Sequence, residues 1–261
     1  RRQRQMCIRD RTYVADDNWH EILWSNNWPL RIQFVTDGKI YIGMEEHSSV
    51  DPKPRGAPYI CLDCITGDEV WRINGGFRQT HWGGNSIIGD GIIATMNTYD
   101  QRIYAVGKGA SALTLSVSPK VGTKGASVQI DGTIMDVSPG TNSPELLARF
   151  PNGVPAISDA DMSEWMKYVY MQFERPAQAT GVTVIFCAVD PDGQYMDLGR
   201  TTSDSYGNYG FAFKPEKEGT YQIIANFEGS GAYYGSTTTT YLTVDPASVS
   251  APVSYTHLRA H

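Results

Sequence analysis

The sequence predicts an all-β fold in two units, and three observations carry this prediction. Two Asp-Gly pairs, Asp37-Gly38 and Asp90-Gly91, each lie between apolar runs and stand 53 residues apart. From Ser111 onward, short segments rich in Thr, Ser and Val alternate polar and apolar residues. Helical spacing of apolar residues is confined to one stretch at about 158–172. The repeat predicts sheets that recur along the chain, and the alternating segments predict a sandwich.

Each repeat of the first unit begins with a predicted β-hairpin. Asp-Gly between two apolar runs favours a tight turn, because both residues tolerate the positive φ that the turn requires. A third strand is predicted after each hairpin, at 57–63 and 101–106. Only the first repeat continues through a Thr-Gly-Asp turn into a fourth strand, at 69–73, so we expect the second repeat to be the last. A similar segment at 21–24 is predicted to be the outer strand of another repeat.

The order strand, Asp-Gly turn, strand, aromatic-rich strand, Thr-Gly turn and Trp resembles the repeats of β-propellers related to the pyrroloquinoline-quinone (PQQ) family. The resemblance covers residues 12–109 and implies a partial propeller of about two blades. In such blades the tryptophan usually packs between neighbouring sheets. Trp71 is therefore expected to be structural, together with the turn glycines Gly38, Gly67 and Gly91.

Residues 110–246 predict a β-sandwich with a short helical insertion. Strands at a spacing of eight to twelve residues are typical of sandwiches, and we expect them at 113–117, 127–133, 182–189, 195–199, 209–213, 221–227 and 238–244. The stretch from Thr201 to Tyr221 resembles the immunoglobulin-like modules of bacterial and archaeal surface proteins. Ser158 and two early aspartates predict the start of the helix at 158–172. Residues 247–252 are predicted to be a linker.

Both ends of the chain resemble translated sequencing-adapter DNA. Residues 1–11 match a translated transposon end, and residues 253–261 match the same element read from the opposite strand. We interpret both as artefacts of a metagenomic fragment, the alternative being a basic nucleic-acid-binding arm and a frayed tail. The two ends contain six Arg and one Asp; without them 16 basic and 27 acidic residues remain, a net charge of −11 instead of −6. This acidity argues against a nucleic-acid partner.

Two clusters in the first unit carry the candidate binding residues. Glu46 and His47, followed by Arg55 in a loop rich in Pro and Gly, form its densest polar cluster. His81 and Trp82 lead into the second repeat, and the resemblance places such segments near the propeller axis, where ligands usually bind. Each cluster also has a structural interpretation. The first suits a solvated or ion-paired loop, and the second suits a tight crossing between sheets, because two glycines follow the tryptophan.

The sequence predicts no catalytic residue and no metal site. Cys61 and Cys64 form a single C-x-x-C pair, but no second Cys or His pair stands at zinc-ligand spacing, so both are expected to be strand-packing residues. Cys187 lies in an apolar run and is predicted to be buried in the core. Patterns such as Gly-x-Ser-x-Gly, His-Glu-x-x-His, a phosphate-binding loop or a dinucleotide fingerprint do not occur.

The predicted function is that of a non-catalytic binding or scaffold protein of the cell surface or envelope, in archaea or bacteria. The pairing of the two domains, the acidity of the chain and the lack of catalytic patterns motivate this prediction. The propeller would present an interaction face to a protein or polysaccharide ligand, and the immunoglobulin-like domain would be a spacer. We also expect a membrane anchor in the full-length protein. No run of about 18 apolar residues occurs in the chain itself. No cofactor is predicted for this function.

The alternative is a fragment of a PQQ-dependent oxidoreductase, a quinoprotein dehydrogenase, which would use PQQ and calcium. Such enzymes hold the quinone with a pair of adjacent cysteines, and this chain has no adjacent cysteines. The alternative rests on the resemblance of the repeats alone, which indicates a fold more directly than an activity.

Overall fold

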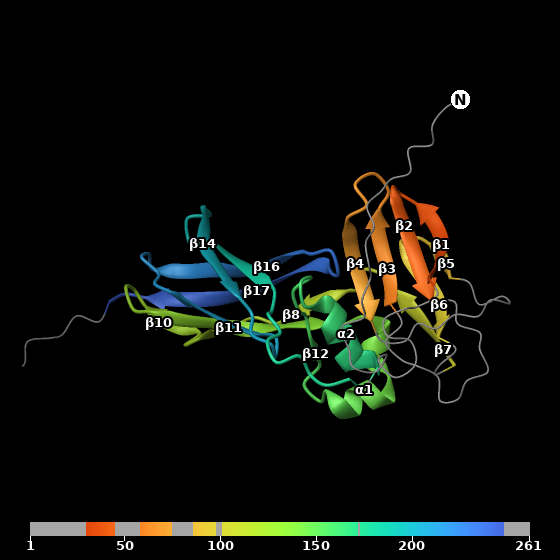
Figure 1. Ribbon diagram of the computed structural model, residues 1–261. Coiled ribbons are helices and arrows are strands. Elements are labelled where there is room, and N and C mark those ends of the chain that lie inside the picture. Colours follow the sequence, from red (N-terminus) through yellow and green to blue (C-terminus); the bar gives the residue numbers. More distant parts are fainter. Residues whose placement is uncertain (1–29, 45–57, 75–85, 98–100, 172, 248–261) are drawn as a thin grey trace, which may run out of the picture.

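The computed structural model describes residues 30–44, 58–74, 86–97, 101–171 and 173–247. Within these ranges the protein is all-β, with seventeen strands and two short α-helices (Figure 1). The strands form four sheets. Two meander sheets lie at one end of the molecule and a pair of larger sheets at the other, with the helices between them.

The first two sheets are antiparallel meanders in chain order. Their strands are β1 (Leu30–Thr36), β2 (Lys39–Met44), β3 (Pro58–Asp63) and β4 (Glu69–Asn74), then β5 (Ile87–Gly89), β6 (Ile92–Asn97) and β7 (Arg102–Val106). The predicted Asp-Gly turns are confirmed, since φ is 49° and 66° at Asp37 and Gly38, and 50° and 74° at Asp90 and Gly91. Two successive positive φ angles define the type I′ turn, whose twist matches that of the flanking strands.

The two meander sheets pack against one another through one apolar cluster. The first sheet contributes Tyr41, Tyr59 and Cys61, which are buried, and the second contributes Ile93. Trp71 is half-buried in the same cluster, and its ring stacks on that of Tyr59 with centroids 6.0 Å apart and planes 10° apart. The aromatic rings of β2, β3 and β4 thus form the wall against which the second sheet rests.

The larger sheets form a sandwich around the main core. Its strands are β8 (Ser111–Leu113), β9 (Ser116–Ser118), β10 (Val121–Thr123), β11 (Val128–Asp136), β12 (Val154–Pro155), β13 (Thr183–Val189), β14 (Tyr195–Thr202), β15 (Asn208–Phe213), β16 (Gly219–Gly229) and β17 (Tyr234–Asp245). One sheet has the order β10-β17-β16-β13-β14, and in the other β8, β9, β12 and β15 all pair with β11. Alternate side chains point inward, so Phe186, Ile223 and Leu242 are fully buried between the sheets.

A helical insertion separates β11 from β13. It contains a 3₁₀ turn (Pro139–Asn142), α1 (Pro144–Arg149) and α2 (Met162–Met171). The predicted helix is present as α2, although residues 158–161 form a turn before it. Helix α1 was not predicted, but its sequence carries a start signal. The Ser143 hydroxyl accepts a hydrogen bond from the backbone N–H of Leu146 at 3.3 Å, and Pro144 occupies the first turn.

Helix α2 joins the two units. Trp165 and Val169 are buried with the rest of the insertion, whereas Met166 packs against the cluster of the meander sheets. The Ser163 hydroxyl donates a hydrogen bond to the backbone carbonyl of Arg72 in β4. The chain itself provides a second link, because the backbone of Gly109 pairs with the β16–β17 connection through two hydrogen bonds of 2.8 Å. In the part of the chain that is described, no helix is long and apolar enough to cross a membrane.

Candidate functional site

The five predicted binding residues, Glu46, His47, Arg55, His81 and Trp82, lie outside the described residues. They stay predictions. The described residues hold no group of three or more His, Cys, Asp or Glu side chains that suits a metal ion.

The residues predicted to be structural lie in turns and in the apolar cluster. Gly38 and Gly91 occupy the two hairpin turns, and Trp71 packs on the aromatic wall between the meander sheets. Gly67 closes the turn between β3 and β4, where its N–H donates to the carbonyl of Asp63 at 3.0 Å. The Asp63 carboxylate accepts two further backbone N–H bonds in that turn, and these bonds lower its pKa.

The Cys61-x-x-Cys64 pair does not form a site. Cys61 is buried in the apolar cluster, whereas Cys64 is exposed in the turn that follows β3. Burial raises the pKa of the Cys61 thiol, which keeps it protonated at neutral pH. Nucleophilic attack requires the thiolate, which this shift disfavours.

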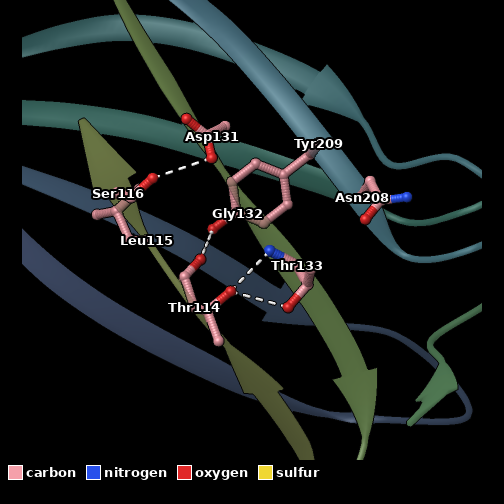
Figure 2. A pocket seen from close by; sticks show the side chains of 8 residues that line it. All are labelled: Thr114, Leu115, Ser116, Asp131, Gly132, Thr133, Asn208 and Tyr209. Carbon is pink, nitrogen blue, oxygen red and sulfur yellow. Dashed lines mark hydrogen bonds between the residues drawn. The ribbon is translucent and has the colours of Figure 1, made fainter. Parts of the chain in front are cut away.

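A hollow of about 320 Å³ lies where β8 gives way to β9 (Figure 2). It is lined by residues of the break and of three strands: Thr114, Leu115, Ser116, Asp131, Gly132, Thr133, Asn208 and Tyr209. The Ser116 hydroxyl donates to Oδ2 of Asp131 at 2.9 Å, as Figure 2 shows. Hydroxyl, amide and carboxylate groups therefore surround the hollow, and groups of these kinds can bind a polar ligand.

The polar groups of the hollow instead bind one another. The hydroxyls of Thr114 and Thr133 lie 2.8 Å apart, and the Tyr209 hydroxyl, whose pKa is raised by burial, donates to the carbonyl of Thr114. Gly132 permits this approach, since a Cβ there would lie 2.0 Å from that carbonyl oxygen and 2.7 Å from the tyrosine hydroxyl. The predicted single strand at 113–117 is wrong, because a side chain binds the Thr114 carbonyl and the strand breaks. We interpret the hollow as a structural joint.

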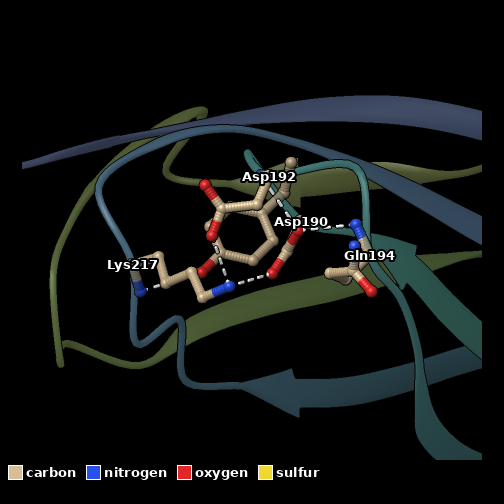
Figure 3. Close-up of polar contacts among 5 residues, drawn as sticks. Asp190, Asp192, Gln194 and Lys217 are labelled. Atoms are coloured by element: carbon tan, nitrogen blue, oxygen red, sulfur yellow. Dashed lines mark hydrogen bonds and ion pairs between the residues drawn. The ribbon is translucent and has the colours of Figure 1, made fainter.

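A second polar cluster connects the β13–β14 turn to the segment before β16 (Figure 3). Nζ of Lys217 bonds to the carboxylates of both Asp190 and Asp192, at 2.6 Å for Asp192. The Asp190 side chain is only 6% exposed and also accepts the N–H groups of Asp192 at 2.9 Å and Gln194 at 2.8 Å. The lysine, followed by these N–H bonds, lowers the pKa of Asp190. Because Lys217 already fills the position that a cation would take, the cluster is a staple between two loops.

Comparisons with known proteins do not assign a family. No family model and no curated protein matches the chain. A β-glucosidase from Listeria innocua in complex with gluconolactone is 10% identical over 56% of this chain and 17% of its own, with a TM-score of 0.28. The sporulation control protein Spo0M of Bacillus subtilis is 11% identical over 52% of this chain and 50% of its own, with a TM-score of 0.26.

The fibronectin(III)-like modules of CbhA from Clostridium thermocellum show a similar level of likeness. They are 11% identical over 88% of this chain and 100% of their own, with a TM-score of 0.30. This chain spans less than two thirds of the length of the β-glucosidase and of Spo0M. What can be said of function therefore comes from the surfaces of the molecule itself.

Proposed function

We propose that this chain belongs to a non-catalytic binding or scaffold protein of the cell surface or envelope. In this proposal the meander sheets are blades of a partial PQQ-like β-propeller and offer the interaction face. The sandwich is an immunoglobulin-like spacer that holds this face away from its point of attachment.

One observation carries the proposal, which is the apolar outer face of the second meander sheet. On the side opposite the cluster, Ile87 is 68% exposed and Ile103 is 78% exposed, and Ile92 and Met96 are exposed beside them. Met96 and Ile103 are direct cross-strand partners. An apolar face of this kind usually marks a contact with another molecule or sheet.

The strand arrangement of the sandwich supports the role of a spacer. The short β10 runs parallel to β17, while β8 and β9 pair with β11 in the facing sheet. The opening segment thus contributes to both sheets, as expected for an immunoglobulin-like module. The paired strands β16 and β17 have 11 and 12 residues. At roughly 3.3 Å per residue they span nearly 40 Å, which is a long, stiff element for a module of this size.

Cross-linking on intact cells that carry the full-length protein tests the proposal. We expect a membrane-impermeant cross-linker to join the wild-type protein to a surface partner. The variant Ile87→Asp/Ile103→Asp should lose this product, because carboxylates on the outer face oppose its burial. The matched control is Ile65→Asp, since Ile65 is exposed in the β3–β4 turn away from that face. Equal cross-linking by all three proteins would contradict the proposal.

A PQQ-dependent oxidoreductase makes the opposite prediction in a different assay. Full-length protein supplied with PQQ and calcium would then oxidise an alcohol or a sugar, with reduction of an artificial dye. We expect no such turnover. Dye reduction that requires both PQQ and calcium would replace the proposed function with this one.

A further inference from the structure

The outer face of the five-stranded sheet, which points away from the sandwich core, carries two exposed tyrosines on a single row. Tyr241 of β17 stands opposite Gln222 of β16, Gln222 opposite Val189 of β13, and Val189 opposite Tyr195 of β14. Tyr241 is 61% exposed and Tyr195 is 67% exposed. Three strand spacings of about 4.8 Å separate the two tyrosines, a distance of roughly 14 Å. We call these four residues the tyrosine row.

The ring of Tyr195 is held against the sheet. Its hydroxyl donates a hydrogen bond to Sγ of Cys187 at 2.6 Å. Cys187 lies two residues before Val189 on the same face of β13, a diagonal neighbour that an aromatic side chain can reach. The predicted burial of Cys187 is confirmed, but on the face opposite the core. The ring of Tyr195 is therefore fixed at its backbone end and at its hydroxyl, although the residue is 67% exposed.

Hydrogen-bonding groups lie around and between the two rings. The amide of Gln222 makes no hydrogen bond within the described residues and stands on the row itself. Thr239 is exposed on the neighbouring row, and beyond it the Thr237 hydroxyl donates to Oδ1 of Asn226 at 2.6 Å. The half-buried Val189 is the only aliphatic side chain of the tyrosine row. The face therefore combines two exposed aromatic rings with uncharged polar groups and with the half-buried Val189 and Ile224.

The charge of this face differs from that of the chain. Asp197 of β14 stands opposite Cys187, beside Tyr195, and Arg200 stands opposite Ile185 further along the same strand, so the two charges on this strand are opposite in sign. The positions of the face on β16 and β17, from Thr220 to Asn226 and from Thr237 to Thr243, are uncharged. The whole chain has a net charge of −6. Complementary charge selects partners, so a face without excess charge on an acidic protein favours an uncharged ligand.

We propose that the tyrosine row binds a neutral, linear polysaccharide. Sugar rings have apolar C–H faces that stack on Tyr195 and Tyr241, and their hydroxyls bond to Gln222 and the threonines between. Tyrosine supplies a large, rigid contact surface at a low cost in conformational entropy. The fully buried centre of a protein interface is more apolar than its rim, whereas here the amide of Gln222 lies between the two rings. The inference goes beyond the proposed function, because it gives the sandwich a binding face of its own in addition to the outer face of the second meander sheet.

Affinity electrophoresis of the full chain tests this site. The gels contain one polysaccharide each: xyloglucan, mixed-linkage β-glucan, galactomannan or xylan, with anionic alginate for comparison. We expect at least one neutral polymer to retard the wild-type protein and alginate to leave it unaffected. Tyr195→Ala/Tyr241→Ala should weaken the association constant at least about tenfold, equivalent to about 1.4 kcal/mol. Tyr195→Phe/Tyr241→Phe keeps both rings and should stay within about twofold of wild type.

Two controls separate binding from folding. Tyr206→Ala removes another exposed tyrosine, in the β14–β15 connection, and should bind as wild type does. Thermal melting of the alanine variant should remain a single transition close to that of the wild type, because both rings are largely exposed and only the hydrogen bond from Tyr195 to Cys187 is lost. Absence of retardation in every neutral gel, or equal retardation of wild type and the alanine variant, would overturn the proposal.

The outcomes also distinguish this site from the proposed function. If no polysaccharide binds, but cross-linking on intact cells still captures a partner that Ile87→Asp/Ile103→Asp loses, the binding function stands and the polysaccharide site is wrong. If that partner is lost by Tyr195→Ala/Tyr241→Ala instead, the tyrosine row binds a protein, which also overturns the polysaccharide site.

Discussion

Replacing Gly132 by alanine should destabilise the sandwich strongly. The added Cβ would lie 2.0 Å from the carbonyl oxygen of Thr114 and 2.7 Å from the hydroxyl of Tyr209. The clash is with backbone, so it can be relieved only if the β8–β9 break moves. That movement costs about 1–3 kcal/mol as overpacking, and the loss of the hydrogen bond between Tyr209 and Thr114 adds about 1 kcal/mol. We expect the free energy of unfolding to fall by about 3 kcal/mol.

Hydrogen exchange followed by mass spectrometry measures this effect locally. Peptides from β11 and β15 should lose protection in Gly132→Ala, while those from β3 and β4 should not change. The control is Gly89→Ala, because a Cβ at Gly89 meets no atom within 4 Å; it should lie within about 0.5 kcal/mol of wild type. Tyr209→Phe, which removes only the hydroxyl, should cost about 1 kcal/mol. Our interpretation of the hollow as a joint fails if Gly132→Ala is as stable as Gly89→Ala.

Three further substitutions test the packing and the staple. Trp71→Ala should reduce the stability of the meander sheets by about 2–3 kcal/mol in urea unfolding, which is less than for a fully buried tryptophan. The control is Val70→Ala, which should have little effect because Val70 is exposed. Equal effects of the two substitutions would contradict the packing role of Trp71. Met166→Ala should raise the rate of hydrogen exchange in β4 but not in β16. Unchanged exchange in β4 would contradict the interpretation that α2 connects the meander sheets to the sandwich. A carboxyl whose pKa is lowered by folding stabilises the protein above its ordinary pKa, near about 3.9, and this contribution is lost as the pH falls through the folded pKa. Asp190→Asn should therefore flatten the fall of the melting temperature below about pH 4, and an unchanged slope would contradict the staple.

Local signals accounted for the parts of the fold that the sequence predicted. The two Asp-Gly hairpins follow from the φ preferences of adjacent residues, and the strands from β13 to β17 follow from alternation within each segment. Helix α2 followed from apolar spacing. Helix α1 has a serine cap and a proline at its start, but with six residues it is too short for a clear period.

The rest depends on pairing between distant residues. The break between β8 and β9 requires Gly132 and Tyr209 to meet Thr114, and neither is near it in sequence. The tyrosine row requires the register of four strands, because Tyr195 and Tyr241 lie 46 residues apart. Sequence analysis therefore selected Glu46, His47, Arg55, His81 and Trp82 from local polar clusters and missed the row. Exposed aromatics at alternate positions of predicted strands are the signal that would have indicated it.

Labelling of intact cells tests the central claim most directly. A membrane-impermeant amine-reactive biotin reagent is applied to cells of the native host that carry the full-length protein, and the biotinylated fraction is compared before and after lysis. We predict that the protein is labelled on intact cells to nearly the same extent as after lysis, as a cell-surface binding protein must be. Labelling that appears only after lysis would contradict the account.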